Sequence, residues 1–125
     1  MLKKLAMTVS LGAVLATLTT STAFGNAVDR YGNADPRVAT TTVARHSSIT
    51  FRPVLFSGSD IGKVEITGDG STILDVEVYD QNGNFIIHYA GYSPWVTFRP
   101  YYTQGFTIRV QNLGNVSNNF TLRTN

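Results

Sequence analysis

The sequence predicts an all-β protein, an antiparallel β-sandwich of seven to eight strands. From residue 48 onward, apolar and polar residues alternate with a period of two, which is typical of strands with one buried face. Turn-forming residues recur at intervals of about 8–12 positions. No segment after residue 27 has the apolar spacing of an amphipathic helix. Short strands at this spacing indicate a sandwich.

The chain has 125 residues, of which 42% are hydrophobic and 14% are charged, and it contains no cysteine. This length suits one domain, and the apolar content is sufficient for a packed core. The lack of cysteine excludes disulfide scaffolds, thiolate metal sites and cysteine nucleophiles.

Residues 1–27 have the layout of a secretory signal peptide. Lys3 and Lys4 precede a largely apolar run over residues 5–18, and small residues follow. This run is shorter than the ~20 residues that span a bilayer. We expect cleavage after Gly25 or Ala27, and a secreted or periplasmic protein.

Removal of this segment would change the charge balance. Two of the ten basic residues lie in it, whereas all eight acidic residues follow it, so the mature chain would have a formal charge of zero. A neutral chain offers no basic surface for nucleic acid and no cationic helix for a membrane. The partners expected are a protein or an extracellular polymer, and the oligomeric state stays open.

Residues 28–46 are expected to be a loose leader or to include an edge strand near 38–44, and the sandwich domain is expected over 47–125. Ile49, Phe51 and Leu55 mark the first strand of this domain, and Pro53 predicts an edge position or a bulge within it. Asn82 and Gly83 predict a tight hairpin turn. The remaining strands are expected over 64–66, 74–79, 85–89, 95–98, 106–110 and 120–122.

The apolar positions of these strands define a predicted core. Truncation of one such residue to alanine should cost ~2–5 kcal/mol. The predicted core residues are Phe51, Leu55, Val64, Ile66, Leu74, Val76, Val78, Ile86, Trp95, Phe98, Phe106, Ile108, Val110, Phe120 and Leu122.

Three segments carry a resemblance to a known family: VEITGDG with LDVEVYDQNGN over 64–84, TQGFTIRVQNLG over 103–114, and NNFTLRTN over 118–125. In this order they resemble the bacterial pre-peptidase C-terminal (PPC) domain family, especially its small stand-alone secreted members. The resemblance covers about residues 48–125. It implies a jelly-roll-like sandwich and an accessory, maturation or substrate-adhesion role, and some relatives bind calcium or an extracellular polymer such as collagen.

Calcium is the cofactor that the residues allow. Asp69, Asp75, Asp80 and Asn82 offer the hard oxygen ligands that this ion prefers. The alternative is that Asp80 and Asn82 only build the hairpin turn, through hydrogen bonds from their side chains to the backbone. The chain also lacks two carboxylates of the Asp-Thr-Asp-Leu-Asp pattern that many PPC domains have.

Catalysis has weaker support in the sequence. Ser93, His88 and Asp75 could supply a hydrolase triad, but no nucleophile elbow accompanies them. Asp75 and Glu77 share one strand face, where solvated carboxylates are the simpler interpretation. We therefore expect that the protein is not an enzyme.

Aromatic residues gather over positions 89–102. Tyr92, Tyr101 and Tyr102 fall in expected loops, where an aromatic ring can bind a sugar or a protein partner. Packing at the ends of the sheets is the alternative, and it is the interpretation preferred for Trp95. The expected function is a non-enzymatic secreted binding or accessory module. The alternatives are a calcium-stabilised structural domain and, least favoured, a hydrolase.

Overall fold

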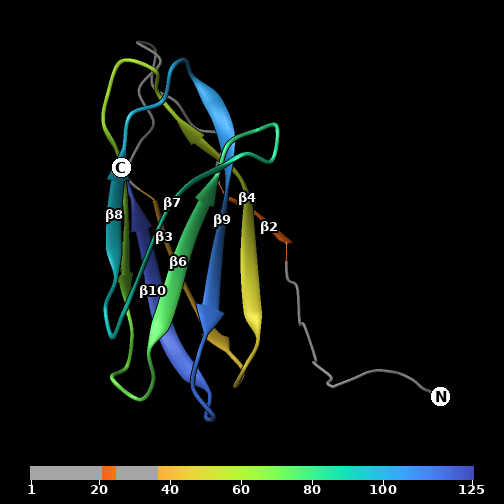
Figure 1. Ribbon diagram of the computed structural model, residues 1–125, viewed down its shortest axis with the longest axis vertical. Coiled ribbons are helices and arrows are strands. Elements are labelled where there is room, and N and C mark those ends of the chain that lie inside the picture. The colour runs from red at the N-terminus through yellow and green to blue at the C-terminus, as the bar shows by residue number, and fades with distance from the viewer. Residues whose placement is uncertain (1–20, 25–36) are drawn as a thin grey trace, which may run out of the picture.

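The computed structural model describes residues 21–24 and 37–125, whose regular structure consists of two packed β-sheets (Figure 1). The first sheet has the order β3 (Arg37–Val43), β10 (Asn118–Thr124), β5 (Gly62–Thr67) and β8 (Trp95–Phe98). The second has the order β2 (Ser21–Phe24), β4 (Ser48–Phe56), β9 (Gln104–Asn112), β6 (Leu74–Tyr79) and β7 (Phe85–Gly91). None of the described residues belongs to a helix long and apolar enough to cross a membrane.

The strand order is that of a jelly roll. Strands β3 to β10 all pair antiparallel. Counted from one to eight along the chain, they follow the orders 1-8-3-6 and 2-7-4-5 in the two sheets. The predicted antiparallel sandwich is therefore confirmed.

The N-terminal segment adds a short strand to this framework. β2 pairs parallel with β4 at the edge of the five-stranded sheet. The rest of the predicted signal peptide, and both expected cleavage positions, lie outside the described residues. β3 pairs with β10 over its whole length, which corresponds to the edge strand allowed near residues 38–44.

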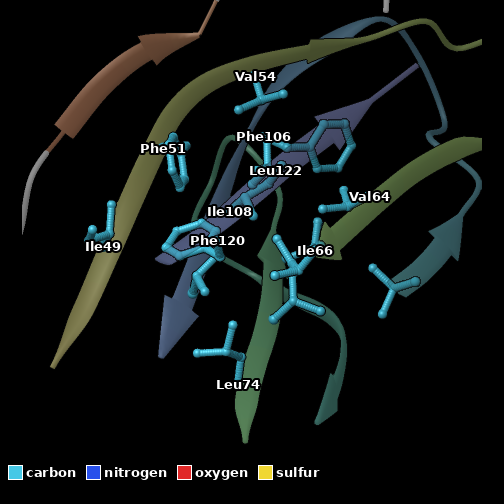
Figure 2. Packing of buried hydrophobic residues seen from close by; sticks show 14 of the residues in the cluster. Ile49, Phe51, Val54, Val64, Ile66, Leu74, Phe106, Ile108, Phe120 and Leu122 are labelled. Atoms are coloured by element: carbon cyan, nitrogen blue, oxygen red, sulfur yellow. The ribbon is translucent and has the colours of Figure 1, made fainter. Parts of the chain in front are cut away.

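The core lies between the two sheets (Figure 2). Alternate residues of β6, β9 and β10 point into it, because a pleated strand buries every second side chain. Phe51 of β4 meets Phe120 of β10 edge to face, with ring centroids 6.2 Å apart. β7 differs from the other core strands, since it supplies only Ile87, a partly buried residue packed against the core.

The predicted burial of Leu55 is wrong. The pairing of β4 with β9 shifts between Phe51 and Val54, as expected for a bulge at Pro53. This shift turns Val54 and Phe56 inward and leaves Leu55 half-buried. The bulge fits closely against β9, because a Cβ atom at Gly105 would lie 2.8 Å from the Cβ atom of Pro53.

The predicted burial of Ile86 and Trp95 is also wrong. The pairing of β6 with β7 passes from Val78–Ile87 to Tyr79–Phe85, so Ile86 is an unpaired bulge residue and its side chain is exposed. In β8 the buried positions are Val96 and Phe98, which places Trp95 on the outer face. Ile86 and Trp95 both lie on strands at the edge of their sheets.

Candidate functional site

β7 and β8 are the end strands of the two sheets on the same side of the sandwich (Figure 1). A groove lies between them. Its volume is about 340 Å³. It is lined by Ile87, His88, Tyr89, Trp95, Val96 and Thr97.

The two aromatic residues of the groove come from different sheets. Tyr89 pairs with Val76 and therefore shares the inner face of the five-stranded sheet, but it stands at the edge of the sandwich and remains 57% exposed. Trp95 pairs with Glu65 on the outer face of the other sheet and is 58% exposed. One exposed ring thus stands on each side of the groove.

The groove lining contains no Asp, Glu, Lys or Arg side chain. The Nζ atom of Lys63 lies over the ring of Trp95, 5.7 Å from its centroid. The same Nζ atom is 2.7 Å from a carboxylate oxygen of Glu65. Because its charge is matched by a neighbouring carboxylate, Lys63 does not give the groove a net positive field.

His88 is held by a carboxylate on the neighbouring strand. Its Nδ1 atom lies 3.2 Å from Oδ1 of Asp75. Partial burial raises the pKa of the Asp75 carboxyl, and the hydrogen bond with His88 acts in the opposite direction. With Nδ1 directed at Asp75, Nε2 is the other ring nitrogen of His88 that can form a hydrogen bond.

The outer face beside His88 carries a second polar group of residues. Arg109 Nη1 lies 3.2 Å from Glu77 Oε1, and the hydroxyl of Tyr79 donates to the same oxygen at 2.8 Å. Glu77 is therefore occupied by two donors from its own sheet. The expected Asp75–Glu77 pair does share this face, but each carboxylate has its own partner.

The three residues of the hypothetical hydrolase triad are only partly assembled. Asp75 and His88 are in contact, and Ser93 is exposed in the turn between β7 and β8. Within residues 37–125, no hydrogen bond joins Ser93 to His88. The arrangement lacks the link between nucleophile and base that defines such a triad.

The tyrosines predicted to bind a ligand lie at opposite ends of the sandwich. The carbonyl oxygen of Tyr92 is near Gly68, in the connection between β5 and β6. Tyr102 lies beside Gly58, in the connection between β4 and β5, and its hydroxyl accepts a hydrogen bond from Gln81 at 2.9 Å. Tyr92, Tyr101 and Tyr102 are all exposed, but the structure does not bring them to one site.

The residues predicted to bind calcium are also divided. Asp75 and Asp80 lie near opposite ends of β6, and a strand rise of ~3.3 Å per residue separates their Cα atoms by about 16 Å. Asp69 precedes β6, whereas Asn82 lies with Asp80 in the turn after it. One ion therefore does not contact all four residues. Within the described part of the chain, no group of three or more His, Asp or Glu side chains is arranged to hold a metal.

Asp69 and Asp80 act instead as hydrogen-bond acceptors for nearby backbone N–H groups. Asp69 accepts hydrogen bonds from the backbone N–H groups of Ser71 and Asn119 at 2.9 and 2.8 Å. Asp80 accepts from the backbone N–H groups of Asn82 and Asn84, both at 2.9 Å. These contacts match the turn-building alternative for Asp80, with Asn82 contributing its backbone.

We expect calcium to leave the thermal midpoint unchanged. An ion that binds only the folded state adds about 2.7 kcal/mol at a hundredfold excess over its Kd, which would raise the midpoint by roughly 10–20 °C. Differential scanning calorimetry in chelator and in millimolar calcium measures this directly. A rise that Asp80→Asn abolishes would contradict the turn-building role.

The same hydrogen bonds predict a dependence of stability on pH. The Ser71 hydroxyl and the Asn119 backbone lower the pKa of Asp69, and the Asn84 backbone lowers that of Asp80. A lowered carboxyl pKa gives stability that is present above the ordinary value near 3.8 and is lost as the pH falls through the folded-state value.

Thermal unfolding between pH 7 and pH 2 tests whether stability decreases as the pH falls. Asp80→Asn should lower the midpoint at pH 7, because the amide is a weaker acceptor than the carboxylate. The gap from the wild type should close at the acid end, where Asp80 is protonated. If the difference in midpoint stayed constant from pH 7 to pH 2, the effect would not come from the charge of the Asp80 carboxylate.

No protein-family model matches the chain, and a search of curated proteins gives no match. The three segments that resemble the PPC domain family form, in order, β5 and β6 with the turn that follows, β9 with its flanking residues, and β10 with Asn125. The resemblance rests on those segments.

Proposed function

We propose that this chain is a non-enzymatic secreted binding module whose ligand occupies the groove between β7 and β8. The observation that carries the proposal is the pair of exposed aromatic rings, Tyr89 and Trp95, on the two sides of one groove. Aromatic rings supply most of the contact energy in many binding sites, because they bury a large apolar area with few rotatable bonds.

The surrounding surface supports the same proposal. Single exposed apolar residues are common on soluble proteins, but contiguous ones on neighbouring elements mark interaction sites. Besides Tyr89 and Trp95, the exposed large residues of β7 and the following turn are Phe85, Ile86 and Tyr92. All five lie within residues 85–95, on two strands and the turn that joins them.

The polar residues near the groove support binding better than catalysis. Nucleophilic catalysis requires a nucleophile within hydrogen-bond reach of its base. Within residues 37–125, no hydrogen bond joins the imidazole of His88 to a serine hydroxyl, and Glu77 is engaged by Arg109 and Tyr79. The resemblance to PPC domains adds the expectation of an accessory role beside other secreted proteins.

Retention of the purified protein on immobilised extracellular polymers tests the proposal. Trp95→Ala and Tyr89→Ala should each weaken retention by about tenfold or more, which corresponds to about 1.4 kcal/mol of lost contact. Tyr101→Ala is the matched control, because Tyr101 is 98% exposed but lies in the connection after β8. Equal loss in the Tyr101 variant, or no retention on any polymer, would contradict the proposal.

A further inference from the structure

Both strand edges that face the groove are poorly suited to pairing with an added strand. β8 has only four residues and is bounded by Pro94 and Pro100. β7 carries a bulge at Ile86, where its pairing with β6 shifts. Short strands, flanking prolines and bulges are the features that protect sheet edges from strand addition. The groove therefore has no long, regular strand edge with which an extended peptide could pair. We expect side chains, and not backbone groups, to contact the ligand.

The side chains of the groove combine aromatic faces with uncharged polar groups. Tyr89 and Trp95 provide the faces, and the hydroxyl groups of Tyr89 and Thr97 can donate or accept hydrogen bonds. Nε2 of His88 adds another hydrogen-bonding atom, since Nδ1 is directed at Asp75. A pyranose ring has the complementary chemistry, because one face presents C–H groups that pack on an aromatic ring and its rim presents hydroxyls.

The absence of charged side chains from the groove lining indicates which kind of polymer can bind there. An anionic or cationic polymer requires a matching charge, and the groove lining has no acidic, lysine or arginine side chain. The ammonium of Lys63, which lies over the ring of Trp95, forms an ion pair with Glu65. Resting on the binding function proposed above, we infer that the ligand is an uncharged polysaccharide chain, with sugar rings packed on Trp95 and Tyr89.

The four residues of β8 also fit a chain rather than a single sugar. At a rise of ~3.3 Å per residue, the Cα atoms of Trp95 and Phe98 lie about 10 Å apart, which is longer than one pyranose ring. His88 and Thr97 lie on the two opposing walls and can contact the hydroxyls of a sugar held between them. Asp75 is a positioning residue in this arrangement, because it acts on the ligand only through the imidazole of His88.

Trp95 provides a direct optical probe of the groove, because it is the only tryptophan in the chain. Its fluorescence is titrated with cellohexaose, chitohexaose and mannohexaose as neutral probes. Polygalacturonate serves as a charged polymer and a collagen-like peptide as the protein probe. We expect at least one neutral oligosaccharide to change the emission of Trp95 and to protect it from a soluble quencher. Because no ion pair forms, the affinity should be the same at low and high salt.

Variants separate this inference from a general loss of structure. Tyr89→Ala should weaken binding of the neutral oligosaccharide by about tenfold or more in the fluorescence titration. Tyr101→Ala should leave this affinity unchanged. Trp95→Ala is followed by calorimetry and should lose binding, with Trp95→Phe retaining part of it. Because Trp95 is exposed, its variants should keep the thermal midpoint of the wild type. Asp75→Asn should weaken binding less than Tyr89→Ala does.

The outcomes distinguish the inference from the function on which it rests. Binding of polygalacturonate alone, with an affinity that falls with salt, overturns the neutral-ligand inference but keeps a binding module. Binding of the collagen-like peptide alone has the same consequence. Failure of every probe, together with failure of the retention assay, overturns the proposed function itself.

Discussion

Replacement of Phe56 by alanine is expected to lower the free energy of unfolding by about 3–5 kcal/mol. The side chain is 1% exposed, and its ring meets those of Phe98 and Phe106 edge to face, with centroids 4.9 and 5.6 Å apart. Truncation removes both aromatic contacts and leaves a cavity between the two sheets. The surrounding strands are fixed by their ladders, so they close this cavity only in part. Urea denaturation of the variant and the wild type measures the difference.

Leu55→Ala is the matched control for this prediction. The alternation of the sequence places Leu55 in the core, whereas the structure leaves it half-buried beside the inward-facing Phe56. Its truncation should therefore cost less than about 1.5 kcal/mol. If Leu55→Ala destabilised the protein as much as Phe56→Ala, the register of β4 beyond Pro53 would be wrong.

The parts of the fold that the sequence predicts well are the regular strands with one buried face. In β6 and over residues 106–111 of β9, apolar and polar residues alternate without interruption, and the observed burial alternates in the same phase. The turn at Asn82 and Gly83 was equally predictable, since Gly83 has a φ of 84°, which glycine adopts without strain. At these places the local sequence pattern and the tertiary structure agree, so the pattern alone is sufficient for the prediction.

The errors occur where a local pattern leaves the buried face undetermined. In β8, alternation establishes only that Trp95 shares a face with Thr97 and lies opposite Val96 and Phe98. The contacts of Phe98 with Phe56 and Phe106 settle which face is inside, and those partners come from β4 and β9. The bulges at Pro53 and Ile86 shift the phase of the alternation, which the period itself cannot indicate.

The candidate site could also not be predicted from local sequence patterns alone. The sequence indicates that aromatic residues gather over positions 89–102, but it does not say which of them meet. Tyr89 and Trp95 flank one groove only because β7 and β8 end their respective sheets on the same side. Tyr92 and Tyr102 separate to opposite ends because β8 runs between their loops. Sheet order is a property of the whole chain, so no single motif predicts the groove.

The second large effect is expected from Asn112→Ala, which should lower the free energy of unfolding by about 3 kcal/mol. Asn112 is fully buried at the end of β9. Its Nδ2 atom lies 3.3 Å from the carbonyl oxygens of Val43 and Ala44 and 2.8 Å from that of Val116. Its Oδ1 atom accepts from the backbone N–H of Gly114 at 3.0 Å. One side chain thus connects the β3–β4 turn to the loop between β9 and β10.

Removal of this amide leaves several buried backbone groups without their side-chain partner, which is more costly than the loss of an exposed hydrogen bond. Asn119→Ala is the control, because Asn119 is exposed and its Oδ1 accepts only from the hydroxyl of Thr42 on the neighbouring strand. It should cost less than about 1 kcal/mol. Similar losses in the two variants would mean that Asn112 does not hold the loops together.

Asn112→Asp isolates the donor role of the amide from its volume. The new carboxylate would place an oxygen among the three carbonyl oxygens and would be buried, so its pKa should rise in the folded state. A raised carboxyl pKa makes the folded variant gain stability as the pH falls, because protonation removes the buried charge and restores one donor. The gap between variant and wild type should therefore be larger at pH 7 than at pH 4. A gap that widened towards acid would show that the amide does not act as a donor to those carbonyls.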